Sequence, residues 1–178
     1  MSAKSFTTSS FHPPNVSGRE AVPHIFRQRP HVFAVIVRNK NGNVVVLEAA
    51  PKDGRLSDVD SYWLDLDPSY KKRARARGRT HDRDEFGMMD RRGYGLRVLS
   101  SHAKYLIVSM AQLPNVHLRV RLEGDVTNAY VQLNGAICRL QHVYVHDTVG
   151  YGFLPQVEYV EVHGLNRCRQ QVVERFRP

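Results

Sequence analysis

The sequence predicts a mainly β protein, a compact antiparallel β-sandwich or barrel, from three observations. Short apolar runs rich in β-branched residues recur along residues 31–164, separated by Asn-Gly, Asp-Gly and other glycine turns. One run, over residues 116–122, alternates strictly between apolar and polar side chains. The 178-residue chain is long enough to bury a core without a disulfide or a metal ion. These features are typical of a single β-rich domain.

Two further segments flank the predicted domain (residues 31–164). We expect residues 1–30 to form an extended N-terminal arm, because its four prolines interrupt every helical or strand pattern. Residues 165–178 form either a basic tail or a short helix. The helical alternative depends on the spacing of the apolar residues Leu165, Cys168, Val172 and Phe176.

The domain begins with a predicted hairpin and a third strand. The runs HVFAVIVR and NVVVLEAA flank the turn residues Asn41 and Gly42, which is a strong hairpin signal. Both runs are continuously apolar, so we expect strands that are buried on both faces. In the next run, SYWLDLD, Tyr62 and Leu64 lie on one face of a strand and Trp63 on the other.

One short helix is expected at about residues 83–92. Asp82 and Glu85 have the spacing of a capping box. Gly93 and Gly95 then supply the conformational freedom that ends a helix. After this helix the pattern returns to β structure, with candidate strands in LRVLSS, KYLIVSM, VHLRVRLEG, NAYVQLNG, ICRLQHVYVH and QVEYVEVHG.

The alternating strand at residues 116–122 is predicted to have one wet, basic face. Its apolar members point toward the core and its polar members toward solvent. The inward set is Val116, Leu118, Val120 and Leu122, and the outward set is His117, Arg119 and Arg121.

The charge of the chain favours an acidic partner. The net charge is +9 and the isoelectric point is about 9.9. Residues 71–92 alone contain nine Lys/Arg against four Asp/Glu, a net of +5. Such a surface suits nucleic acid or an acidic protein assembly. The predicted partner-binding residues are two aromatic anchors in the arm and the basic run: Phe6, Phe11, Lys71, Lys72, Arg73, Arg75, Arg77 and Arg79.

Catalytic, cofactor and metal sites are not predicted. His142 and His146 share a strand face, and His163 on a neighbouring strand completes a conceivable metal site. However, residues four apart on a strand are about 13 Å apart, too far for one ion. No nucleophile elbow, phosphate loop or calcium loop is present in the sequence. We therefore expect a protein that is not an enzyme and carries no cofactor.

Several motifs resemble those of the uncharacterised family called domain of unknown function 4833. They are a turn with Arg38, Lys40 and Asn41, a valine-rich strand ending in Glu48 and Ala49, the pair Tyr62-Trp63, and the segment Arg91, Arg92, Tyr94 and Gly95, with Gly93 in place of an expected alanine. The resemblance covers about residues 31–100. It implies a compact β-rich domain and no established activity.

The preferred function is a structural, non-enzymatic protein that docks on an acidic assembly. A cytoskeletal filament such as the ciliary or flagellar doublet microtubule is the assembly we expect, with tubulin and neighbouring filament proteins as partners. An RNA- or ribosome-associated protein is the main alternative, and a ligand-binding barrel or enzyme is a third. Two cysteines and the lack of an apolar leader or membrane span predict a cytoplasmic or cytoskeletal location without membrane contact.

Overall fold

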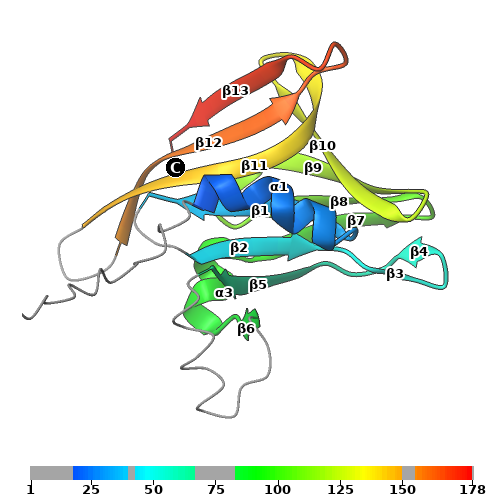
Figure 1. Ribbon diagram of the computed structural model, residues 1–178, viewed down its shortest axis with the longest axis horizontal. Coiled ribbons are helices and arrows are strands. Elements are labelled where there is room, and N and C mark those ends of the chain that lie inside the picture. The colour runs from blue at the N-terminus through cyan, green and yellow to red at the C-terminus, as the bar shows by residue number, and fades with distance from the viewer. Residues whose placement is uncertain (1–17, 40–42, 67–82, 150–154, 178) are drawn as a thin grey trace, which may run out of the picture.

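The computed structural model describes residues 18–39, 43–66, 83–149 and 155–177 (Figure 1). Most of these residues lie in strands, and two short helices accompany them. The elements are α1 (Gly18–Gln28), β1 (Val32–Arg38), β2 (Asn43–Glu48), β3 (Pro51–Lys52), β4 (Arg55–Leu56), β5 (Asp60–Asp65), β6 (Arg83–Glu85), α3 (Met88–Tyr94), β7 (Leu96–His102), β8 (Tyr105–Met110), β9 (Leu113–Glu123), β10 (Val126–Leu133), β11 (Ala136–Val149), β12 (Pro155–Leu165) and β13 (Gln171–Phe176).

Eleven of the described strands form one large curled sheet, a half-barrel, and β3 and β4 form a separate two-stranded sheet. This architecture confirms the predicted mainly β, barrel-like fold. The main path of the large sheet runs β6-β5-β2-β1-β11-β10-β9-β8-β7, and β12 and β13 extend from β11. Register shifts between β1 and β2, between β7 and β8, between β8 and β9, and within the β11–β12 pair accompany the curl. The sheet is mixed rather than wholly antiparallel, because β1 pairs with β11 in parallel. No hairpin turn joins these two strands, so nothing local fixes their relative direction.

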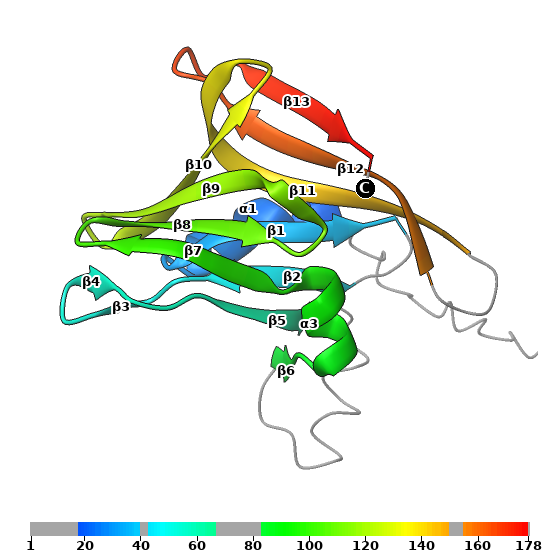
Figure 2. The same cartoon turned by 180° about the vertical axis from the view of Figure 1, so that it is seen from behind.

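The half-barrel has hydrophobic packing on both faces of β1, β2 and β5. Between these strands and β7–β11 lies the main core, which includes Phe33, Leu118 and Leu133. On the opposite face, α1 covers a second cluster that includes Val35 and Val46 (Figures 1 and 2). Every residue from Val32 to Val37 is buried. The expectation that continuous valine-rich runs are covered on both faces is confirmed.

The N-terminal segment is partly helical, which corrects the prediction of an arm without regular structure. Helix α1 includes Pro23, which removes one helix hydrogen bond. Val22 and Ile25 are buried against the sheet, and burying such a side chain is worth about 1.5–3 kcal/mol. This packing outweighs the loss at the proline. Residues 1–17, including Phe6 and Phe11, lie outside the described residues.

Two other helix predictions need correction. Residues 83–85 form the short strand β6, and helix α3 begins only at Met88. Pairing of β6 with β5 holds this stretch extended, so the expected helix starts later and continues through Gly93. The C-terminal segment contains strand β13 rather than a helix or tail. Residues 171–176 pair one by one with the edge of β12. Tertiary pairing overrides the helical spacing of its apolar residues.

The two cysteines differ in their exposure to solvent. Cys138 is buried and Cys168 is exposed, and both thiols are free. Burial raises the pKa of the Cys138 thiol. No helix in the described part of the chain has the length and apolar character that crossing a membrane requires.

Candidate anion-binding groove

Three of the residues that carry the family resemblance, Arg38, Trp63 and Tyr94, contact one another, whereas Lys40 and Asn41 lie outside the described residues. The Arg38 guanidinium lies 4.6 Å from the centre of the Trp63 ring and 5.4 Å from that of Tyr94. It also donates a hydrogen bond of 3.2 Å to the Tyr94 hydroxyl. The Trp63 ring contacts Tyr94 edge-on at 5.1 Å and Phe86 at 5.6 Å. This cation–aromatic cluster joins β1, β5 and α3, so the motif has a structural role.

Gly95 makes the exit from α3 possible. Its N–H donates to the Arg91 carbonyl at 3.0 Å. A Cβ at this position would lie 2.3 Å from the same carbonyl oxygen, so only glycine fits. Gly93, by contrast, lies inside the helix, and a Cβ there would meet no atom within 4 Å. Glycine is therefore sterically required at position 95 but not at position 93.

A second polar cluster lies on the opposite face of β5, around Tyr62. The Tyr62 hydroxyl donates to a Glu48 carboxylate oxygen at 2.9 Å. The guanidinium of Arg83 lies 3.9 Å from the centre of the Tyr62 ring, and Arg29 donates to its hydroxyl at 3.3 Å. Burial and the neighbouring Glu48 raise the pKa of Tyr62 to about 12. The cluster connects the end of α1 and strand β6 to β2 and β5.

The raised pKa of Tyr62 predicts an alkaline loss of stability. The folded state holds the Tyr62 proton more tightly than the unfolded state, whose tyrosines titrate near pH 10. The resulting stability is present below pH 10 and is lost as pH rises toward 12. Urea unfolding at a series of pH values between 10 and 12 measures the free energy of unfolding of the wild type and of Tyr62→Phe, which retains the ring. The free energy is expected to fall more steeply with pH in the wild type. The same dependence on pH in both proteins would contradict this assignment.

The histidines pair across strands rather than converge. His142 and His163 lie opposite each other on β11 and β12, with rings stacked at 4.2 Å. His146 instead stacks on Tyr159 at 4.7 Å. Among the described residues, no group of three or more His, Cys, Asp or Glu side chains is arranged to hold a metal ion. The stacking contacts account for the positions of these three imidazoles.

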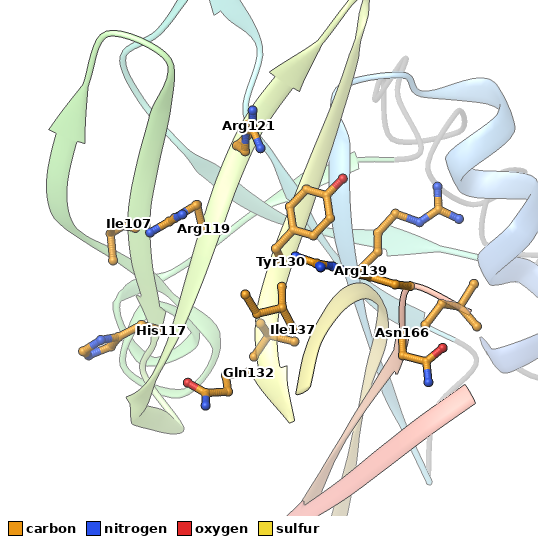
Figure 3. Close-up of a pocket in the computed structure, with 12 residues that line it drawn as sticks. Ile107, His117, Arg119, Arg121, Tyr130, Gln132, Ile137, Arg139 and Asn166 are labelled. Atoms are coloured by element: carbon orange, nitrogen blue, oxygen red, sulfur yellow. The ribbon is translucent and has the colours of Figure 1, made fainter. Parts of the chain in front are cut away.

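A groove of about 740 Å³ lies on the outer face of β8–β11 (Figure 3). The side chains on this face alternate with those that fill the core, such as Leu118 and Val120. The end of β12 and the residues after it form one wall. The groove is lined by Ile107, His117, Arg119, Arg121, Tyr130, Val131, Gln132, Ile137, Arg139, Leu165, Asn166 and Arg167.

The floor of the groove contains one continuous row of paired residues. Strand register places Ile107 opposite Arg119, Arg119 opposite Tyr130, Tyr130 opposite Arg139, and Arg139 opposite Leu165. Tyr130 therefore stands between two guanidinium groups on neighbouring strands, as Figure 3 shows. The four arginines that line the groove are exposed, and none of the described lining residues is acidic. The arrangement attracts anions.

Hydrogen bonds hold the central tyrosine in place. The Tyr130 hydroxyl lies 3.0 and 3.1 Å from the two carboxylate oxygens of Glu123, which also accepts a bond of 3.0 Å from Asn128. Burial and the Glu123 contact raise the pKa of Tyr130, so the phenol remains neutral. Nearby, Arg119 lies over the Tyr105 ring at 4.9 Å. Tyr130 is therefore the aromatic residue between two guanidinium groups of the floor, and Arg119 also contacts Tyr105 beside the groove.

The sequence identified part of this groove. The outward positions of His117, Arg119 and Arg121 were predicted, and all three are exposed. Tyr130, Arg139 and Arg167 were missed, although alternation in NAYVQL and ICRL places the first two outward. Pairing between strands, which the sequence does not reveal, brings them together. The predicted partner-binding residues of the basic run, from Lys71 to Arg79, lie outside the described residues.

Comparison with known proteins gives one result. The model of the family named "Domain of unknown function (DUF4833)" matches residues 34–175. No curated protein and no solved structure matches the chain. The family match includes the Arg38, Trp63 and Tyr94 cluster and every strand of the groove. The chain therefore belongs to the DUF4833 family.

Proposed function

We propose that this protein is a non-enzymatic interaction protein that docks on an acidic macromolecular assembly through the groove. The observation that carries the proposal is the convergence of Arg119, Arg121, Arg139 and Arg167 in one hollow whose described lining residues include no acid. Guanidinium groups form strong, directional bonds with carboxylates and phosphates. A net charge of +9 also attracts such a partner over longer distances.

The chemistry of the groove favours binding over catalysis. Arginine keeps its proton throughout the physiological range and is a poor acid or base. His117 is the one histidine among the described lining residues. The other described histidines and Asp147 lie outside the groove lining. Asp147 is buried, and its backbone N–H and carbonyl are hydrogen-bonded to the Asn39 side chain. The groove thus has groups for holding an anion but no nucleophile paired with a base.

Two kinds of assembly fit this proposal. An acidic filament in the cytoplasm or cytoskeleton, such as the doublet microtubule of a cilium or flagellum, would present carboxylates to the arginines. An RNA-containing assembly would present phosphates, and one observation favours it specifically: Tyr130 lies between Arg119 and Arg139 on an open sheet face. Aromatic side chains in such positions bind bases by stacking.

The test compares a variant that lacks two positive charges of the groove with a variant that lacks two positive charges elsewhere. The variant Arg119→Ala/Arg139→Ala is compared with Lys52→Ala/Arg55→Ala, which removes the same charge from the exposed β3–β4 hairpin. Binding to microtubules, polyglutamate and oligonucleotides is measured across a salt series. The groove variant is expected to lose about 10- to 100-fold in affinity for its preferred polyanion, while the hairpin variant changes little. Equal losses in both variants, or no binding to any polyanion, would contradict the proposal.

A further inference from the structure

We propose that the groove binds a single-stranded polynucleotide, with Tyr130 stacking on a base and Arg119 and Arg139 contacting phosphates. This inference rests on the proposed function and names the partner class for the same site. It follows from the pairing of the floor strands, from the order of side chains along the floor, and from the charged side chains around the groove.

Three strands of the groove floor offer a peptide no free edge. β8 pairs with β7 and β9, β9 with β8 and β10, and β10 with β9 and β11. An extended acidic peptide gains much of its affinity by adding to an exposed sheet edge. On these three strands it would have only side-chain contacts, because the ladders already use the backbone groups. A polynucleotide needs no backbone pairing, since it binds through phosphate contacts and stacking.

The row across the floor matches the alternation of a nucleic-acid strand. Arg119 and Arg139 lie on strands on either side of Tyr130, so their backbones are about 10 Å apart. Tyr130 contributes a planar surface between these two positive charges, and Glu123 fixes its hydroxyl. Phosphates can bind the guanidiniums while a base stacks on the ring. Gln132 and Asn166 extend the groove with amide groups that can hydrogen-bond base edges (Figure 3).

The charged side chains around the groove limit where phosphates can bind. The groove adjoins a smaller hollow lined by Asn134 and Glu174, where the Glu174 carboxylate accepts a bond of 2.6 Å from the Asn134 N–H. That carboxylate would repel phosphates. A further hollow is lined by Arg167 together with Ile137 and Asn166. Phosphates are therefore expected to bind nearer to Arg167 than to Glu174.

A single strand suits this site better than a duplex. In a duplex the bases are stacked on one another, and their faces are not available to Tyr130. The guanidinium row alone would still attract duplex phosphates, but without the stacking contribution. Preference for a single strand over a duplex of the same charge is therefore a direct consequence of the tyrosine.

The experiment uses a matched pair of substitutions at position 130. Tyr130→Leu removes the aromatic surface, and Tyr130→Phe keeps the ring but removes the bond to Glu123. Fluorescence anisotropy follows binding of the full-length protein to labelled oligouridylate, oligodeoxythymidylate, a duplex and polyglutamate. Tyr130→Leu is expected to weaken single-strand binding by about 5- to 100-fold, while Tyr130→Phe stays within about twofold of wild type.

Polyglutamate separates this inference from the proposed function. Polyglutamate is expected to bind the wild type more weakly than oligonucleotides do, and to bind Tyr130→Leu with the same affinity as the wild type. Unchanged polyglutamate binding would also show that the variant retains its fold. Polyglutamate binding as tight as oligonucleotide binding, or a Tyr130→Leu variant that binds oligonucleotides like wild type, would overturn the inference and leave the acidic-partner proposal standing. Duplex binding as tight as single-strand binding would also overturn it. Different affinities for the ribose and deoxyribose strands would identify which polynucleotide the groove prefers.

Discussion

Gly95→Ala is expected to lower the free energy of unfolding by about 3 kcal/mol. A Cβ on residue 95 would lie 2.3 Å from the Arg91 carbonyl oxygen and 3.1 Å from the Arg91 carbonyl carbon. Both are backbone atoms of α3, so the steric clash can be relieved only by movement of the helix end and not by rotation of a side chain. Such movement would disturb Tyr94 and its contacts with Trp63 and Arg38. Urea unfolding measures the loss as a lower midpoint at an unchanged slope.

Gly93→Ala is the matched control, two residues away in the same motif. Gly93 lies within α3, and an added Cβ there meets nothing within 4 Å. Alanine loses less conformational entropy than glycine on forming a helix, so this variant is expected to gain about 0.5–1 kcal/mol. Similar midpoints for the two variants would contradict the steric explanation of Gly95.

Trp63→Ala is expected to cost about 3 kcal/mol of unfolding free energy. Trp63 contacts Phe86 and Tyr94, and Arg38 lies over its ring. Its removal leaves a cavity where α3 meets β5 and takes away the aromatic partner of the guanidinium. Because Trp63 is the single tryptophan of the chain, unfolding is followed by circular dichroism rather than by tryptophan fluorescence.

Trp63→Phe separates the effect of the ring from that of the cavity. Phenylalanine keeps an aromatic face for Arg38 and most of the apolar contact, so the expected cost is about 1 kcal/mol. A Trp63→Ala variant as stable as Trp63→Phe would show that the cluster does not hold α3 to the sheet.

Local patterns in the sequence identified the strands well. The hairpin of residues 31–50, the two faces of SYWLDLD and the alternation of residues 116–122 all agree with the structure. In each case the side-chain pattern repeats with the period of a strand, and burial follows that period. The family resemblance also proved correct, and its motif residues Arg38, Trp63 and Tyr94 contact one another.

The errors arose where tertiary contacts override local signals. Pro23 argued against a helix, but burial of Val22 and Ile25 on the sheet stabilises α1. The apolar C-terminal residues have helical spacing, but the segment pairs with the edge of β12 and forms strand β13. Groove residues from β10 and β11 were missed for a related reason. The sequence shows which way Tyr130 and Arg139 point, but only strand pairing shows that they meet Arg119.

The central claim is that an anionic partner binds on the outer face of β8–β11. The four groove arginines, the central tyrosine and the lack of acid among the described lining residues all support it. Other exposed basic positions, such as Lys52 and Arg55 on the β3–β4 hairpin, carry charge without a surrounding groove. A partner attracted by net charge alone would not distinguish between these two regions.

Chemical-shift mapping on the isotope-labelled full-length protein tests this claim most directly. Oligouridylate, with polyglutamate in a parallel titration, is added while backbone and side-chain signals are followed. The largest chemical-shift changes are expected at Arg119, Tyr130 and Arg139, and only small changes are expected at Lys52 and Arg55. Shifts spread evenly over the basic surface, or concentrated away from the groove, would contradict it.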